Sequence, residues 1–153
     1  VRKMVKATPR EQALISALAQ RYDAVAPEDR TNLDVAYANA MTRVWEAYPN
    51  DPDIGALCAE AQMNLHPWDF WLKNGKPQPW TPAIVETLER VLELEPNHPL
   101  ACHLYIHAIE ASPHPEKAEA VADRLLALVP NAGHLVHMPS HIYINIGRYH
   151  DGS

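Results

Sequence analysis

The 153-residue sequence predicts an all-α protein. Three observations support this class: signals for helix starts recur along the chain, apolar residues follow them at helical spacing, and no long stretch alternates with the period of a β-strand. A chain of this length forms one domain with an ordinary core or a short array of repeats. We therefore expect a single domain of about seven helices.

The helix starts can be read in order along the chain. Thr8 supplies a capping hydroxyl, Pro9 suits the first helical position, and Glu11 completes a capping box. Apolar residues then recur at helical spacing as far as Tyr22. Later helices are expected to begin at Thr31, at Asp51-Pro52, at Thr81-Pro82, near His98-Pro99, near His114-Pro115 and after Asn131.

Composition excludes several classes of function. Lys and Arg number 13 against 19 Asp and Glu, and the net charge of −6 argues against a protein that binds nucleic acid. No apolar run approaches the roughly 18 residues of a membrane span. No targeting signal opens the chain, and its localisation stays unassigned. The chain begins at Val1 and ends after a turn-like segment, so we expect a fragment of a longer protein.

A short Pro-Asn phrase occurs three times, at Pro49, Pro96 and Pro130. The second interval is 34 residues, and the first is 47 residues, which equals 34 with an insertion of 13. Each phrase follows an apolar helical segment. The sequence therefore predicts a repeated helix pair with an insertion in its second copy.

A helix pair with a 34-residue period, closed by proline, resembles the tetratricopeptide repeat (TPR) family. Ala118, Ala122 and Leu125 precede Pro130 at the spacing of that family's second helix, and the residues from Gly147 resemble its usual turn. Residues 133–143, GHLVHMPSHIY, resemble a segment of His-rich bacterial TPR-repeat-containing proteins of poorly characterised function.

The resemblance is good over residues 50–153 and looser over residues 1–49. It implies a right-handed α-solenoid of TPR-like helix pairs, in which the first helix of each pair lines a concave face. It implies one domain over residues 1–153, with helix pairs at about 8–49, 50–96 and 97–130 and an unpaired last helix at 131–150. The resemblance implies a scaffold role and does not indicate a reaction.

Histidines occupy the expected concave positions, which by resemblance fall 4, 7, 11 and 14 residues after each closing proline. His103 and His107 recur 34 residues later as His137 and His141, and each pair has the spacing of neighbours on one helix face. Adjacent helices lie about 8–10 Å apart, so four imidazoles are expected to converge. The same offsets place further polar residues nearby, namely Glu110, His134, Glu60 and Asp53.

This pattern predicts a metal site, because imidazole binds zinc, copper and iron and histidines four residues apart on a helix can share an ion. We expect His103, His107, His137, His141 and Glu110 to form the metal site. Zinc is the expected ion, with copper and iron as alternatives. The residues assigned to supporting positions around the ion or to the groove are Glu60, His134 and Asp53.

The insertion is rich in aromatic residues. One interpretation is an aromatic lid over the groove, and the other, which we favour, is a loop fixed by its own apolar cluster. Asn74-Gly75 indicates a hairpin-like bend. The aromatic residues concerned are Trp68, Phe70, Trp71 and Trp80.

Two functions of different class fit the sequence. The first is a TPR-like scaffold that binds a transition metal, and whether it is an enzyme stays open. The second is a metal-free adaptor that binds a peptide or partner protein in its concave groove. The unpaired last helix carries Val136 and Tyr143 on an apolar face, which we expect a second copy of the chain to cover.

Overall fold

The computed structural model describes residues 6–152, which confirm the all-α class. In this part of the chain, β-type pairing is limited to an isolated bridge between Trp71 and Pro77. No helix in residues 6–152 is long and apolar enough to cross a membrane. The helices are α1 (Pro9–Ala19), α2 (Thr31–Ala47), α3 (Pro52–Met63), α4 (Thr81–Leu94), α5 (Pro99–Ile109), the short 3-10 helix η2 (Pro115–Ala118), α6 (Glu119–Leu128), α7 (Gly133–His137) and α8 (Pro139–Ile146).

Side chains cap three of these helices where the sequence predicts a start. Thr8 and Glu11 form the expected capping box at α1. The Asp51 carboxylate accepts a hydrogen bond of 3.1 Å from a backbone N–H in the first turn of α3. His98 caps α5, because its Nδ1 accepts the Ala101 N–H at 3.2 Å, and this histidine is buried.

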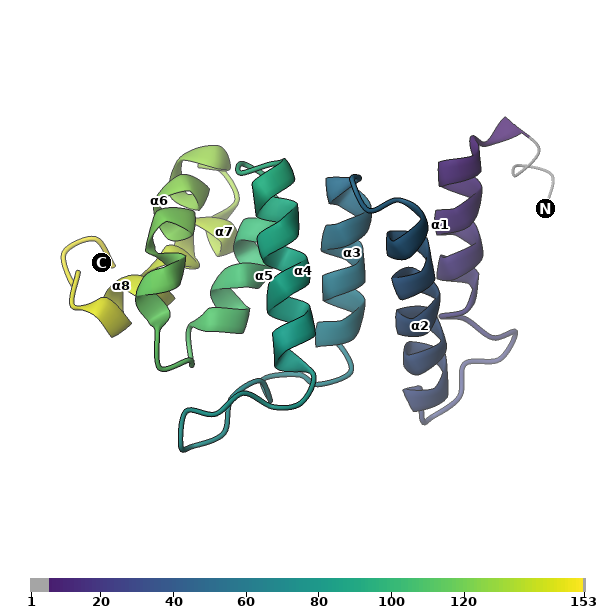
Figure 1. Ribbon diagram of the computed structural model, residues 1–153, viewed down its shortest axis with the longest axis horizontal. Helices are drawn as coiled ribbons and strands as arrows, with labels where there is room; N and C mark the ends of the chain where they lie inside the picture. The colour runs from purple at the N-terminus through teal and green to yellow at the C-terminus, as the bar shows by residue number, and fades with distance from the viewer. Residues whose placement is uncertain (1–5, 153) are drawn as a thin grey trace.

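The helices pack in an order that follows the chain. Figure 1 shows α1 to α5 succeeding one another along the long axis from the N-terminal end, with α6, α7 and α8 grouped at the C-terminal end. Consecutive helices from α1 to α6 contact one another. In addition, α3 contacts α5 and α5 contacts α8, so the helices that follow the three Pro-Asn phrases are neighbours, as the sequence predicts.

The core consists of two adjoining groups of buried residues. The smaller group joins α1, α2 and α3, and the larger group joins α3 to α8. Trp45 packs against both groups and so links them. Ala118, Ala122 and Leu125 are each 0% exposed, which places the residues of the repeat pattern inside the larger group. This packing fixes α5 and α8, which carry His103, His107 and His141, against α6.

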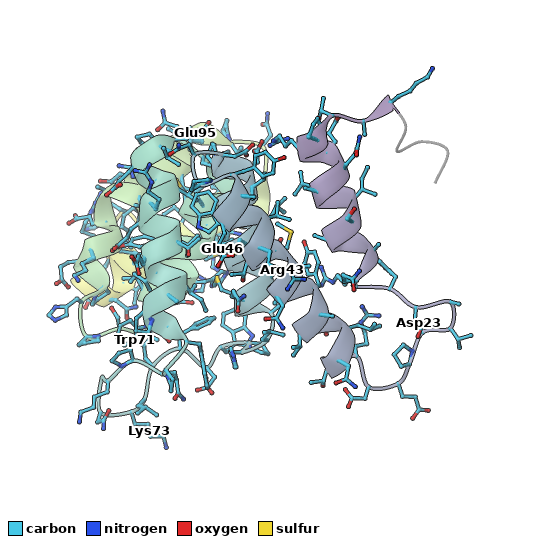
Figure 2. All side chains as sticks on the ribbon, turned by 45° about the vertical axis from the view of Figure 1, so that its right-hand side comes forward. Asp23, Arg43, Glu46, Trp71, Lys73 and Glu95 are labelled. Atoms are coloured by element: carbon cyan, nitrogen blue, oxygen red, sulfur yellow. The ribbon has the colours of Figure 1, made fainter. Side chains whose placement is uncertain are left out.

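The insertion between α3 and α4 forms the expected hairpin-like bend. The Leu72 N–H donates to the Lys76 carbonyl at 2.8 Å, and Gly75 adopts the left-handed region with φ 79°. A residue with a Cβ is disfavoured there, which explains the Asn-Gly signal. Figure 2 shows Lys73 at the outer end of this loop and Trp71 close to its base.

The prediction that Val136 and Tyr143 lie on an apolar face covered by a second copy of the chain is wrong for Tyr143. Tyr143 is 1% exposed, and its hydroxyl donates to the Asp123 carboxylate at 2.8 Å. The Arg148 guanidinium lies 4.3 Å from the centre of the Tyr143 ring. Because α8 packs against α6, it buries Tyr143 inside the chain, and the large apolar side chain that α8 exposes is Ile144.

Gly55 provides a test of this packing. A Cβ at Gly55 would clash with Val91 and would lie 2.9 Å from Cζ3 of Trp45, since α3 approaches both neighbouring helices closely. We expect Gly55→Ala to lower the free energy of unfolding by about 1–3 kcal/mol, measured by urea denaturation.

Gly133→Ala is the matched control. A Cβ at Gly133 would meet no heavy atom within 4 Å. The helix propensity of alanine then leaves the stability equal or raises it by up to about 1 kcal/mol. Equal stability of the two variants would contradict the close approach of α3 to its neighbours.

Candidate metal centre

Helix α5 presents His103 and His107 on the only part of its surface that packing leaves half-exposed beyond its first turn. The residues between and beside them are buried, including Cys102, Tyr105 and Ile106. The two ring centres lie 4.8 Å apart. These two histidines therefore lie on the side of α5 that is not packed in the core.

His134, at the start of α7, completes a group of three imidazoles with His103 and His107. One ring nitrogen of each residue lies within 4.8 Å of the corresponding atoms of the other two. The Nε2 atoms of His103 and His134 are 3.1 Å apart. We call His103, His107 and His134 the three-histidine group. Spacing along the chain predicts only a supporting position for His134, whereas the structure brings it directly to His103.

His137 and His141 form a second, separate contact. Their Nε2 atoms are 3.1 Å apart, and their ring centres are 4.9 Å apart. The chain passes from α7 to α8 between them at Pro139, as expected for a proline within a helical segment. Met138 keeps helical backbone angles, with φ −55° and ψ −40°, so the two rings remain neighbours on one face. We call these residues the His137–His141 pair.

Glu110 lies between the two sets of histidines. Its Oε1 accepts from Nδ1 of His107 at 3.0 Å, and its Oε2 accepts from Nδ1 of His141 at 2.5 Å. The Glu110 side chain is only 16% exposed. Because a carboxylate accepts both bonds, each Nδ1 carries a proton, and each neutral ring keeps its lone pair on Nε2. This is the arrangement in which a carboxylate orients a metal-binding histidine.

The neutral state of His103 and the negative charge of Glu110 favour a bound cation. Burial, together with the neighbouring His107 and His134, lowers the pKa of His103 to about 4. This ring is therefore neutral at pH 7, the form that ligates metals. Burial acts to raise the pKa of Glu110, but hydrogen bonds and positive charge from His107 and His141 outweigh it and lower the pKa. Glu110 therefore carries a negative charge beside the imidazoles.

A cavity of about 250 Å³ opens beside His103 and His107. Glu60 lies in its wall, which agrees with the groove position expected from the sequence. Asp53 is not brought to this place: its carboxylate binds the Arg10 guanidinium at 2.8 Å and lies 3.4 Å from Nε2 of His98. The remaining lining residues are mainly apolar, namely Met63, Asn64, Pro67, Trp68, Phe70 and Leu104.

The aromatic residues of the insertion divide between the two expected roles. Trp68 and Phe70 line the cavity, and the Trp68 ring lies 5.1 Å from that of His107, edge to face. Trp71 instead fixes the loop, because its Nε1 donates to the Ala108 carbonyl at 2.7 Å. Trp80 likewise donates to a carbonyl within the loop at 2.7 Å and stacks on the His66 ring at 3.7 Å.

No family model, curated protein or solved structure matches this chain. Its function is therefore inferred from the chemistry of its own residues. Three imidazole nitrogens near one point, a carboxylate that orients one of the rings, and an adjoining cavity together suit a bound transition-metal ion.

The low pKa of His103 predicts how stability depends on pH. In the unfolded chain this imidazole takes up a proton near pH 6.5, whereas in the folded, chelator-treated protein it does so near pH 4. Between these pH values the unfolded state therefore binds more protons than the folded state. The contribution of neutral His103 to stability is lost as the pH falls through this window. We expect the free energy of unfolding, measured with urea, to fall accordingly.

His103→Gln provides the comparison for this pH dependence, because glutamine keeps a polar side chain and does not titrate. The variant is expected to lose less stability than the wild type between pH 6.5 and pH 4. Identical pH profiles for the two proteins would show that His103 is not held in its neutral form.

Proposed function

We propose that this protein binds a transition-metal ion through the imidazoles of His103, His107 and His134. The observation that carries the proposal is the meeting of one nitrogen from each ring within 4.8 Å. Two nitrogens that share a tetrahedral ion, each about 2.0–2.1 Å from it, lie about 3.3 Å apart. The 3.1 Å between Nε2 of His103 and Nε2 of His134 is close to this separation, so these two rings are already placed to share an ion, and His107 lies within reach of it.

The scaffold in this proposal is a right-handed α-solenoid of TPR-like helix pairs. It is supported by the 34-residue interval between Pro96 and Pro130 and by the contacts of α5 with both α3 and α8. In such a scaffold the first helix of each pair lines one continuous face. Ligands on two neighbouring first helices are then held on packed elements, which keeps their separation fixed when the ion leaves.

Zinc is the ion that we propose, with copper and iron as alternatives. Three neutral nitrogen donors with a further open position are typical of zinc sites that react with an added ligand, and imidazole also suits copper and iron. His107 reaches such an ion through Nε2, because Glu110 already holds its Nδ1 proton. Glu110 thus supports the site by orienting a ligand.

The open position of the ion would face the cavity beside His103 and His107. This cavity, of about 250 Å³, gives water or a small molecule access to the metal. An ion in such a site supplies Lewis-acid chemistry and acidifies a bound water. The Glu60 carboxylate in the cavity wall provides a group that accepts a proton there. The proposal therefore favours a reactive centre over a closed structural one.

The test is metal binding by protein purified without a histidine tag. Isothermal titration with Zn²⁺ is expected to show a tight site, and elemental analysis is expected to find the ion after buffer exchange. His107→Ala removes a ligand, so we expect the affinity to fall by more than about 100-fold, beyond the loss caused by removing an orienting residue.

His114→Ala is the matched control, because His114 is a histidine in the turn before η2 with a side chain 63% exposed. Its affinity for Zn²⁺ is expected to equal that of the wild type. Absence of zinc uptake by the wild type, or equal affinities for the His107 and wild-type proteins, would overturn the proposal and leave the metal-free adaptor.

A further inference from the structure

The His137–His141 pair lies outside the three-histidine group and needs its own explanation. The ring nitrogens that lie within 4.8 Å of one another belong to His103, His107 and His134, whereas Nε2 of His141 lies 3.1 Å from Nε2 of His137. His137 is exposed and the His141 side chain is 32% exposed, so packing in the core does not account for either ring. The pair thus carries a second, solvent-accessible cluster of nitrogen donors.

The hydrogen bond of His141 determines which of its nitrogens is free. Its Nδ1 donates to Oε2 of Glu110, so the neutral ring has its lone pair on Nε2. That lone pair belongs to the atom closest to His137. His137 ends α7 and His141 lies in α8, but the helical backbone angles of Met138 between them keep the four-residue spacing that two imidazole ligands have on one helix face. Their separation of 3.1 Å again approaches the roughly 3.3 Å expected around a shared ion.

Glu110 connects this pair to the three-histidine group without merging them. One oxygen holds Nδ1 of His107 and the other holds Nδ1 of His141. In an imidazole ring the Nε2 lone pair points away from the Nδ1 proton. Two rings that turn Nδ1 toward the same carboxylate therefore direct their Nε2 atoms away from it, each toward other ligands. This geometry favours two ions over one ion shared by all the rings.

We propose that His137 and His141 bind a second transition-metal ion, and that Glu110 orients one ligand of each ion. This inference rests on the proposed function of the three-histidine group. The second site has two protein ligands against three in the first, so it binds its ion more weakly and leaves more positions open to water or an added ligand. The whole cluster is then a two-metal site of unequal affinities.

The experiment is a titration of the tag-free protein with Zn²⁺ that resolves stoichiometry and affinity. We expect two equivalents in two steps for the wild type. His137→Ala is expected to lose the weaker step and to keep the tighter one. Its melting temperature without metal should match that of the wild type, because the His137 side chain is exposed. His114→Ala is expected to keep both steps.

Each other result has a definite meaning. One equivalent that survives His137→Ala overturns the second ion and leaves the three-histidine group intact. One equivalent that disappears in His137→Ala means that the sets share a single ion, which also overturns the inference. No uptake by the wild type overturns the proposed function itself.

Glu110→Gln tests the shared orienting role. Glutamine cannot hold both Nδ1 protons as a charged acceptor, so we expect the affinity for both ions to fall by about 10–100-fold. Glu116→Gln is the matched control, because Glu116 accepts from Nδ1 of His114 at 3.0 Å, away from the cluster. A loss confined to one step, or no loss, would overturn the role of Glu110 at both ions.

Discussion

The burial of α5 limits where the polar cluster can form. This helix contacts α3, α4, α6 and α8, and seven of its 11 residues are buried. A helix packed on so many sides has one narrow stripe left for polar side chains. His103 and His107 occupy that stripe, and Glu110 follows at its end. The position of the cluster is therefore set by the stripe of α5 that is not packed in the core.

The cluster combines polar groups whose burial is costly unless they are paired. Burying an unpaired carboxylate or imidazolium is unfavourable, and Glu110 avoids this cost by accepting hydrogen bonds from two imidazoles. His103 avoids it by remaining neutral, since its pKa is lowered to about 4. Five histidines placed together repel one another when protonated. The Glu110 carboxylate offsets this repulsion, and a cation bound between the rings would replace their protons.

The tryptophans of the insertion have different roles in placing a cavity beside this cluster. Trp71 and Trp80 fasten the loop through indole N–H bonds to backbone carbonyls. The fastened loop holds Trp68 beside His107, although Trp68 has φ 64°, a conformation that costs a non-glycine residue about 1–3 kcal/mol. Strain of this kind persists only where surrounding contacts impose it. The loop is thus both a packed element and a wall of the site.

The helices and the pairing of residues within each helix follow from the amino-acid sequence alone. Caps at Thr8 and Asp51 and the Pro-Asn phrases act locally, so they could be read without a structure, and the four-residue spacing placed His103 beside His107 for the same reason. Which histidines from different helices meet depends on the packing of the helices against one another. The offset between α5 and α7 brings His134 to His103 and leaves His137 with His141, and it leaves Asp53 bound to Arg10. Spacing along a helix fixes the face on which a residue lies, whereas the shift and rotation between neighbouring helices depend on how whole side chains pack.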